Sequence, residues 1–436
     1  MRVKVIGAGL AGCEAAWQLA QRGFEVELCE MKPVKFSPAH KYEGFAELVC
    51  SNSLKASRID SACGLLKEEM RRLGSIIVPA AEKTAVPAGG ALAVNRKDFS
   101  DEVTRIIRNH PKITVVSGEI TEFPEKNAVI CTGPLTSDAF TQKIRERFGE
   151  NGKFMSFFDA SAPIVTADSI DCSIAFSQSR YDKGGDDYLN CPFTKEEYER
   201  FWNELVNAES AELHEFDKNP GVYEGCMPVE VLAKRGIESV RYGCMKPVGL
   251  TDPRTGRRPW AAVQLRKENT EGTMYNLVGF QTHLKFGEQK RVFSLIPGLA
   301  NAEFVRYGVM HRNTYICSRT LLDKNFMLKG SENVFFGGQI TGVEGYVESA
   351  ASGIIAGRAL ADRLSGREPL KLPNTTMLGA IIDYVCDWAD DRYCEFDPMG
   401  ANMGILPPLD ENIRDKREKY AALAQRALKD LDSVLG

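Results

Sequence analysis

The first thirty residues combine short apolar runs with one helical pattern. Residues 3–6 form an apolar run, residues 7–12 a glycine-rich turn, and residues 13–22 a stretch with helical spacing of apolar side chains. A second strand-like run over residues 24–28 leads to Glu30. Strand, glycine loop, helix, strand and acid in this order predict a dinucleotide-binding βαβ unit, although an ordinary strand-turn-helix is the alternative.

The glycine loop has the chemistry that a pyrophosphate requires. Gly7 allows a tight turn, Gly9 lets the backbone approach the pyrophosphate, and Gly12 lets helix and strand pack closely. Free N–H groups at the start of the helix attract phosphates. A fingerprint at the start of a long chain is more typical of FAD-dependent enzymes than of short dehydrogenases. We therefore expect tightly bound FAD, held by Gly7, Ala8, Gly9, Leu10, Ala11, Gly12 and the ribose-binding carboxylate of Glu30.

A second strand-loop-helix pattern occurs much later in the chain. Residues 333–336 form a strand-like run, residues 337–346 a second glycine loop, and residues 347–360 a helix of small side chains. Backbone N–H groups of such a loop suit the flavin ring or the pyrophosphate. The residues expected to bind the cofactor here are Gly337, Gly338, Gln339 and Tyr346.

The pattern between these two units differs from both. Helical patterns over residues 63–73 and 98–108, and β-branched runs at residues 113–117 and 128–131, complete the first sheet. From about residue 153 the segments become mixed and rich in aromatic side chains. We expect an α/β fold, with a Rossmann-like FAD-binding domain of the two-dinucleotide-fold type. This domain is split into residues 1–152 and 311–436, the latter with C-terminal helices, and a mixed α+β domain is inserted at residues 153–310.

Composition narrows the class of protein. A chain of 436 residues with 43% apolar and 26% charged residues can bury the cores of two or three domains. No apolar run approaches the roughly 18 residues of a membrane span, so we expect a cytoplasmic protein without membrane association. The 12 cysteines are scattered and contain no C-x-x-C pair, which indicates reduced thiols and no metal site.

Charge is distributed unevenly along the chain. The formal net charge is −4, yet residues 241–312 carry 12 Lys or Arg against 5 Asp or Glu. This basic segment could bind a polyanion, whereas a solvated basic face is the alternative. Its cations include Arg254, Arg257, Arg258, Arg266, Lys267, Lys285, Lys290 and Arg291.

Seven separated motifs, in one order, resemble the folate- and FAD-dependent tRNA (uracil-5-)-methyltransferases, the TrmFO family. The motifs are residues 7–12, 45–53, 87–94, 188–192, 224–228, 311–315 and 337–346. The resemblance covers essentially the whole chain, which is shorter than the related GidA-type enzymes. It implies that methylenetetrahydrofolate supplies one carbon, that FAD supplies reducing equivalents from NAD(P)H, and that a uridine in the tRNA T-arm becomes 5-methyluridine.

The resemblance also implies roles for individual residues. Cys226 corresponds to the nucleophile, and Cys50 acts beside it as proton acceptor or as a protecting thiol. A thiolate is needed because addition to uracil C6 makes C5 nucleophilic. His311 corresponds to the residue that stacks on folate, and Tyr346 could cover the flavin ring; a structural role is the alternative for each of the four. The expected tRNA phosphate contacts are Arg254, Arg257, Arg258, Lys285, Lys290 and Arg291.

Three other functions are compatible with parts of this pattern. A flavin-dependent NAD(P)H oxidoreductase on a small molecule would use the same N-terminal unit but needs no basic domain. A GidA-like enzyme would modify a wobble uridine. A non-catalytic FAD- or tRNA-binding module would not need two loop cysteines at family positions.

Overall fold

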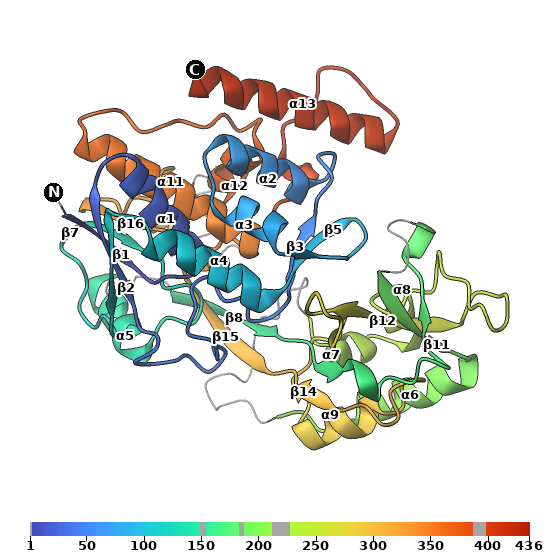
Figure 1. The fold of residues 1–436 in the computed structure, drawn as a ribbon. Helices are drawn as coiled ribbons and strands as arrows, with labels where there is room; N and C mark the ends of the chain where they lie inside the picture. Colours follow the sequence, from blue (N-terminus) through green and yellow to red (C-terminus); the bar gives the residue numbers. More distant parts are fainter. Residues whose placement is uncertain (1, 149–153, 183–186, 212–226, 387–397) are drawn as a thin grey trace.

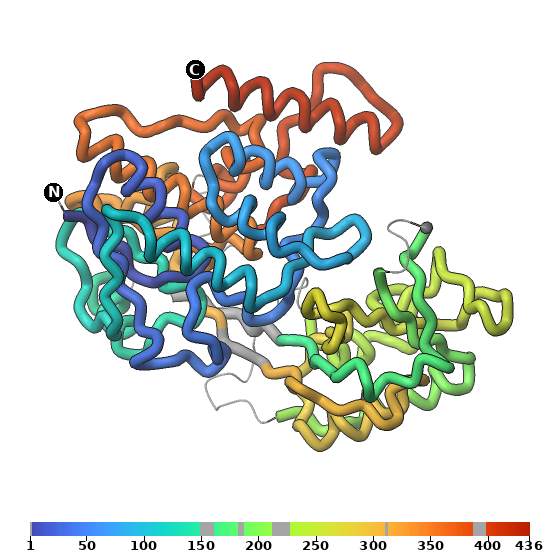
Figure 2. The backbone as a smooth tube through the Cα atoms, viewed as in Figure 1, coloured from blue at the N-terminus to red at the C-terminus, as the bar shows by residue number. Residues whose placement is uncertain are grey.

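The computed structural model describes residues 2–148, 154–182, 187–211, 227–386 and 398–436. Within these ranges the chain forms two lobes (Figure 1), each with its own sheet and its own apolar core. The first lobe contains both the N-terminal and the C-terminal parts of the chain. Figure 2 shows the C-terminal helix on this lobe, on the side away from the second lobe.

The centre of the first lobe is a five-stranded sheet in which every neighbouring pair is parallel. Its strands are rich in valine and isoleucine, and the side chains of its middle strands are mostly buried, as expected for a parallel sheet covered by helices. The strands, in spatial order, are β16 (Glu332–Phe336), β7 (Lys126–Ile130), β1 (Arg2–Ile6), β2 (Glu25–Glu30) and β6 (Ile113–Ser117).

Two helices of this lobe pack with their backbones in contact. They are α1 (Leu10–Gln21) and α11 (Tyr346–Leu364). A Cβ atom on Gly353 would lie 2.1 Å from the carbonyl oxygen of Ala11, and one on Gly357 would lie 2.7 Å from that of Ala15. Because only glycine permits this approach, the start of α11 is brought close to the glycine loop at the start of α1.

The remaining helices of the first lobe complete its core. They are α2 (Ala62–Arg72), α3 (Ile77–Lys83), α4 (Arg96–Arg108), α5 (Asp138–Phe148), α10 (Ser318–Leu321), α12 (Met377–Cys386) and α13 (Lys416–Leu435). No helix in the described ranges is long and apolar enough to cross a membrane.

The second lobe is built on a six-stranded antiparallel sheet. In spatial order its strands are β10 (Phe176–Ser177), β11 (Tyr188–Phe193), β12 (Ala261–Lys267), β13 (Met274–Leu277), β9 (Ile164–Thr166) and β14 (Phe304–Arg306). A chain of aromatic contacts joins Phe193, Phe201, Phe280 and Phe293 in its core. The helices are α6 (Lys195–Asn207), α7 (Val229–Ala233), α8 (Ile237–Tyr242) and α9 (Phe286–Phe293).

Two small sheets lie where the lobes meet. β8 (Phe154–Ala160) pairs with β15 (Met310–Ile316), so the two predicted domain boundaries lie side by side in one ribbon. A second sheet on the first lobe contains β3 (Ser53–Ala56), β5 (Ala91–Val94) and β4 (Ala85–Val86). The turn of this sheet contacts the second lobe, because the Tyr188 hydroxyl donates to the Ala88 carbonyl at 3.0 Å.

Candidate cofactor and active site

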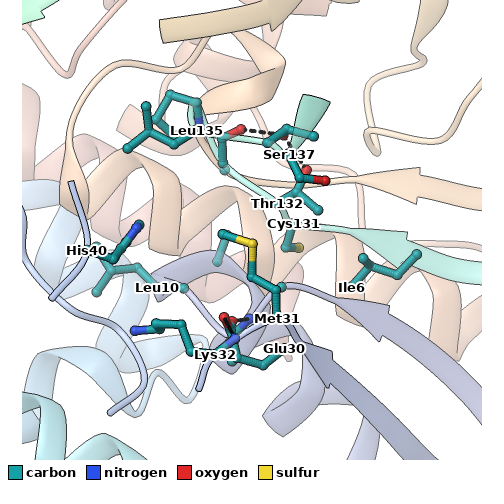
Figure 3. A pocket seen from close by; sticks show the side chains of 18 of the residues that line it. Ile6, Leu10, Glu30, Met31, Lys32, His40, Cys131, Thr132, Leu135 and Ser137 are labelled. Atoms are coloured by element: carbon teal, nitrogen blue, oxygen red, sulfur yellow. Dashed lines mark hydrogen bonds between the residues drawn. The ribbon is translucent and has the colours of Figure 1, made fainter. Parts of the chain in front are cut away.

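A large pocket opens at the carboxyl edge of the five-stranded sheet. The empty space within it, including the part open to solvent, is about 1110 Å³. Residues that follow all five strands line it, among them Gly7, Met31, Gly118, Thr132 and Gly338. Figure 3 shows Glu30, Met31 and Lys32 on one side and Thr132, Leu135 and Ser137 on the other. In open α/β sheets this edge is where ligands bind.

The three glycines of the first loop differ in what surrounds them. Gly7 has φ +98°, and a Cβ atom there would lie 2.5 Å from the carbonyl oxygen of Cys131. A Cβ atom on Gly12 would lie 1.8 Å from the carbonyl oxygen of Gly7, whereas one on Gly9 would meet no atom within 4 Å. Gly7 and Gly12 are therefore required by the fold. The backbone at Gly9 faces open space, as the approach of a pyrophosphate requires.

Glu30 lies at the end of β2, directly beside this loop. Its carboxylate accepts the Ala8 N–H at 2.7 Å and the Lys32 N–H at 3.0 Å, and only 7% of the residue is exposed. The Lys32 ammonium donates to the carbonyl oxygens of Tyr42 and Gly44, which fixes the chain after β2. The acid is thus oriented toward the glycine loop, in the position of a ribose-binding carboxylate.

The second glycine loop reaches the same pocket. Gly338 has φ +86°, and its N–H donates to the Ser352 hydroxyl at 2.7 Å. Gln339 and Tyr346 also line the pocket, and Tyr346 is the first residue of α11. Two glycine loops and a buried acid at one sheet edge fit an extended dinucleotide such as FAD.

Cys50 is half-buried and lies next to Tyr346. The sulfur is 3.1 Å from the Tyr346 hydroxyl oxygen, which also accepts the N–H groups of Cys50 at 2.8 Å and of Ser51 at 3.3 Å. Burial, followed by the negative charge that Cys50 can carry, raises the pKa of Tyr346 well above its usual value near 10. Cys50, one of the two predicted catalytic cysteines, thus contacts Tyr346, which lines the pocket.

Side chains from both lobes hold the loop that carries Cys50. Arg96 on α4 donates to the Leu48 carbonyl at 2.8 Å and forms a two-pronged ion pair with Glu268, which follows β12. Arg266 on β12 donates to the Ser51 hydroxyl at 3.0 Å and to the Asn52 side-chain oxygen at 2.9 Å. The sequence did not single out Arg96, Arg266 and Glu268 as site residues, because their contacts join positions that are far apart in the chain.

Arg266 is one of the cations of the basic segment, but it does not lie on an exposed face. Only 6% of this residue is exposed, and its charge points into the junction between the lobes. Burial lowers the pKa of Arg266 from its ordinary value. The junction therefore contains part of the positive charge that the sequence placed at the surface.

The six predicted tRNA-binding cations lie on the second lobe, and they differ in their partners. Arg254 pairs with Asp252 at 2.8 Å, Lys285 with Glu209 at 2.7 Å, and Arg291 with both Glu288 and Glu204. Among the described residues no ion-pair partner is found for Arg257, Arg258 or Lys290, which are exposed. These three are the cations best placed to accept an external anion.

Two further predicted site residues are Cys226 and His311. Cys226 lies outside the described residues, as does the side chain of His311, whose backbone pairs with Asp159 in the β8–β15 ribbon.

Most other described cysteines are buried, and burial raises the pKa of Cys191 and Cys244 to about 12. Such thiols pack as small apolar residues. Within the described ranges no group of three or more His, Cys, Asp or Glu side chains could hold a metal ion.

The fold and the pocket define a dinucleotide-binding protein of the α/β class with a second, antiparallel lobe. A family model for glucose inhibited division protein A matches residues 2–368. The structure of Aquifex aeolicus GidA in its form II crystal superposes with a TM-score of 0.68 at 16% identity, over 99% of this chain and 73% of that chain. This likeness confirms the predicted fold class.

Sequence comparison identifies the family. The protein named methylenetetrahydrofolate–tRNA-(uracil-5-)-methyltransferase TrmFO of Acetivibrio thermocellus is 57% identical over 98% of this chain and 97% of its own length. A protein of the same name in Heliobacterium modesticaldum is 56% identical over 100% of this chain and 98% of its own length. The one in Enterococcus faecalis is 55% identical over 98% of this chain and 97% of its own length. The chain belongs to the TrmFO family, within the wider GidA group, as the seven motifs predicted.

Proposed function

We propose that this chain is a methyltransferase that converts a tRNA uridine to 5-methyluridine with methylenetetrahydrofolate as one-carbon donor. The observation that carries the proposal is identity of 54–57% over nearly the whole chain with proteins that bear this name. The target is a uridine of the T-arm, as the family resemblance implies. The enzyme acts in the cytoplasm.

FAD is the cofactor that the pocket fits best. The glycine loop would hold its pyrophosphate at Gly9, Glu30 would hold a ribose, and the second loop with Gly338 and Gln339 would hold the flavin end. When bound, the flavin supplies reducing equivalents that come from NAD(P)H. The Tyr346 ring lines the same pocket and is available to cover the flavin ring.

The protein's own residues activate the uracil ring. Carbon C5 of uracil is a poor nucleophile, and addition of a thiolate at C6 places negative charge on C5. We assign this addition to Cys226, on the family resemblance of residues 224–228, and removal of the C5 proton to Cys50. His311 is assigned to folate on the same resemblance. Contacts between the loop that carries Cys50 and residues of both lobes, Arg96 at Leu48 and Arg266 at Ser51, support an active site at the junction of the lobes.

The second lobe is the tRNA-binding domain in this proposal, with residues 153–310 as its extent. Its exposed cations Arg257, Arg258 and Lys290, for which the described part of the chain offers no ion-pair partner, contact phosphates without reading sequence. Arg254, Lys285 and Arg291 already pair with carboxylates and contribute less charge to an incoming polyanion.

The test is incubation of the FAD-loaded enzyme with tRNA that lacks uridine modifications, methylenetetrahydrofolate and NAD(P)H, followed by nuclease digestion and mass analysis. We expect 5-methyluridine in the T-arm fragment, none without methylenetetrahydrofolate, and none with Cys226→Ala. A modified wobble uridine would instead indicate GidA-like activity. Oxidation of NAD(P)H without any change in tRNA would indicate a small-molecule oxidoreductase, and neither product would indicate a binding module.

A further inference from the structure

Hydrogen bonds with side chains of both lobes hold the loop Leu48–Asn52. Arg96 binds its first carbonyl, the Tyr346 hydroxyl contacts its middle, and Arg266 binds the side chains at its end. Asn52 adds bonds from its amide group to the carbonyl oxygens of Val94 at 3.1 Å and of Lys267 at 3.0 Å. This loop presents the Cys50 sulfur in one orientation, next to Tyr346.

Counting hydrogen bonds at the Tyr346 hydroxyl shows which way its hydrogen points. A phenolic oxygen has two acceptor positions and one hydrogen. The backbone N–H groups of Cys50 and Ser51 occupy the acceptor positions. The hydrogen is then left for the Cys50 sulfur, at an oxygen–sulfur distance of 3.1 Å. Because burial raises the pKa of Tyr346, the hydroxyl keeps this hydrogen throughout the physiological range.

Two positively charged side chains act on the Cys50 sulfur. Arg96 on α4 and Arg306 on β14 both interact electrostatically with Cys50. Glu268 neutralises Arg96, while Arg306 has no ion-pair partner among the described residues. Burial, followed by the charge of Arg96, lowers the pKa of Arg306. Nearby in the chain, Glu47 interacts with His40 and forms an ion pair with Lys32. The charges of Arg96 and Arg306 favour the anionic form of the sulfur, whereas the partial burial of Cys50 opposes it.

We propose that Tyr346 is a positioning residue for Cys50, whose hydroxyl donates to the sulfur and, with Arg306, keeps Cys50 in the thiolate form. The assignment rests on the proposed function, in which Cys50 accepts the proton from uracil C5. The C5–H bond then breaks, its electron pair stays on the uracil ring, and the proton forms an S–H bond on Cys50. A thiol could not accept this proton, so the hydrogen bond and the charge at the junction are part of the chemistry.

The test measures Cys50 alone and needs no tRNA. The FAD-loaded full chain is treated with iodoacetamide between pH 5 and pH 10, and alkylation of the Cys50 peptide is quantified by mass spectrometry. A lost hydrogen bond to a charged group corresponds to about one pH unit. In Tyr346→Phe, which keeps the ring, we expect the midpoint of the profile to rise by about one unit and the rate at pH 7 to fall several-fold. Tyr420→Phe, the same change on the distant helix α13, should match the parent.

A second variant covers the case in which Tyr346→Phe does not fold or retain FAD. In Arg306→Gln the midpoint should also rise, because a positive charge near the sulfur is lost. An unchanged or lower midpoint in Tyr346→Phe, or in Arg306→Gln where the first variant fails to fold, would overturn the assignment. Methylation by the parent enzyme would be unaffected by that result, so failure here is distinct from failure of the proposed function.

Discussion

The atoms around Gly9 and Gly12 show which of the two glycines the fold requires and which one cofactor binding requires. Gly12→Ala would bring a methyl group against the Gly7 carbonyl, whereas Gly9→Ala would place one in open space. We expect Gly12→Ala to lower the stability of the FAD-free protein by several kcal/mol, as overpacking does, and to lose FAD as a result. Gly9→Ala should unfold like the parent but bind FAD at least tenfold more weakly. Thermal unfolding of FAD-free protein and FAD titration check both. Equal loss of stability in the two variants would contradict the assignment.

Site residues that are close together in the chain can be predicted from sequence, whereas contacts between distant residues cannot. Gly7, Gly9 and Glu30 line the pocket and are close together in the chain, so a local sequence pattern contains them. The contact between Cys50 and Tyr346 joins residues 296 positions apart, and no local pattern contains it. It depends on the packing of α11 against α1, which is a property of the whole lobe.

At the scale of elements, periodic segments were predicted well and segments with buried polar groups were not. The pattern over residues 98–108 matches α4 closely, because its apolar face and polar face are separate. β12 was read only as part of a basic segment, yet its first six residues are buried, Gln264 and Arg266 among them. Their polar groups bond to Asn190 and to the Cys50 loop, so burial here does not require apolar side chains.

We expect the charges in the loop between α8 and β12 to contribute most to tRNA binding. Arg257 and Arg258 are exposed there, next to a turn at Gly256 with φ +64°. Reversing both charges should weaken tRNA binding and reduce the slope of log affinity against log salt by about 1.4 to 1.8, because each phosphate contact contributes about 0.7 to 0.9. Filter binding from 50 to 300 mM salt measures this slope.

A matched control reverses two cations at the opposite edge of the first sheet. Lys112 precedes β6 and Lys126 starts β7, so both lie at the amino ends of strands whose carboxyl ends face the pocket. Lys112→Glu/Lys126→Glu should leave the salt slope near that of the parent. An equal effect of the two double variants would mean that net charge, rather than this loop, controls binding.

At the scale of the whole molecule, buried carboxylates tie together parts of the first lobe that are distant in sequence. Glu69 on α2 accepts the N–H groups of Met377 at 2.7 Å and Leu378 at 2.8 Å, at the start of α12. Glu14 on α1 does the same for Ile76 and Ile77 at the start of α3. Each completes a helix end that would otherwise have unpaired donors. The arrangement of helices around the sheet thus depends on groups that also titrate.

These groups make stability depend on pH. Burial raises the pKa of Glu69 to about 7, against the opposing effect of its two backbone hydrogen bonds, and that of Glu14 likewise to about 7. Because the ordinary value is 4.5, the folded protein binds more protons than the unfolded chain between these limits. Glu69 therefore makes its full contribution to the free energy of unfolding below about pH 4.5, and this contribution is lost as the pH rises through about 7. The loss is at most about 3 kcal/mol.

Glu69→Gln should remove this dependence, because the amide keeps an acceptor oxygen and does not titrate. We expect the free energy of unfolding of the parent to fall more steeply from pH 5 to pH 7.5 than that of Glu69→Gln, measured by urea unfolding at several pH values. The variant itself is less stable at pH 5, since one of the two helix N–H groups loses its acceptor. Glu332→Gln, the same change at an exposed position at the start of β16, should keep the slope of the parent. Parallel curves for the parent and Glu69→Gln would show that the carboxylate is ionised throughout this range. In that case the N–H groups of α12 would stabilise the ionised carboxylate of Glu69 by more than burial destabilises it.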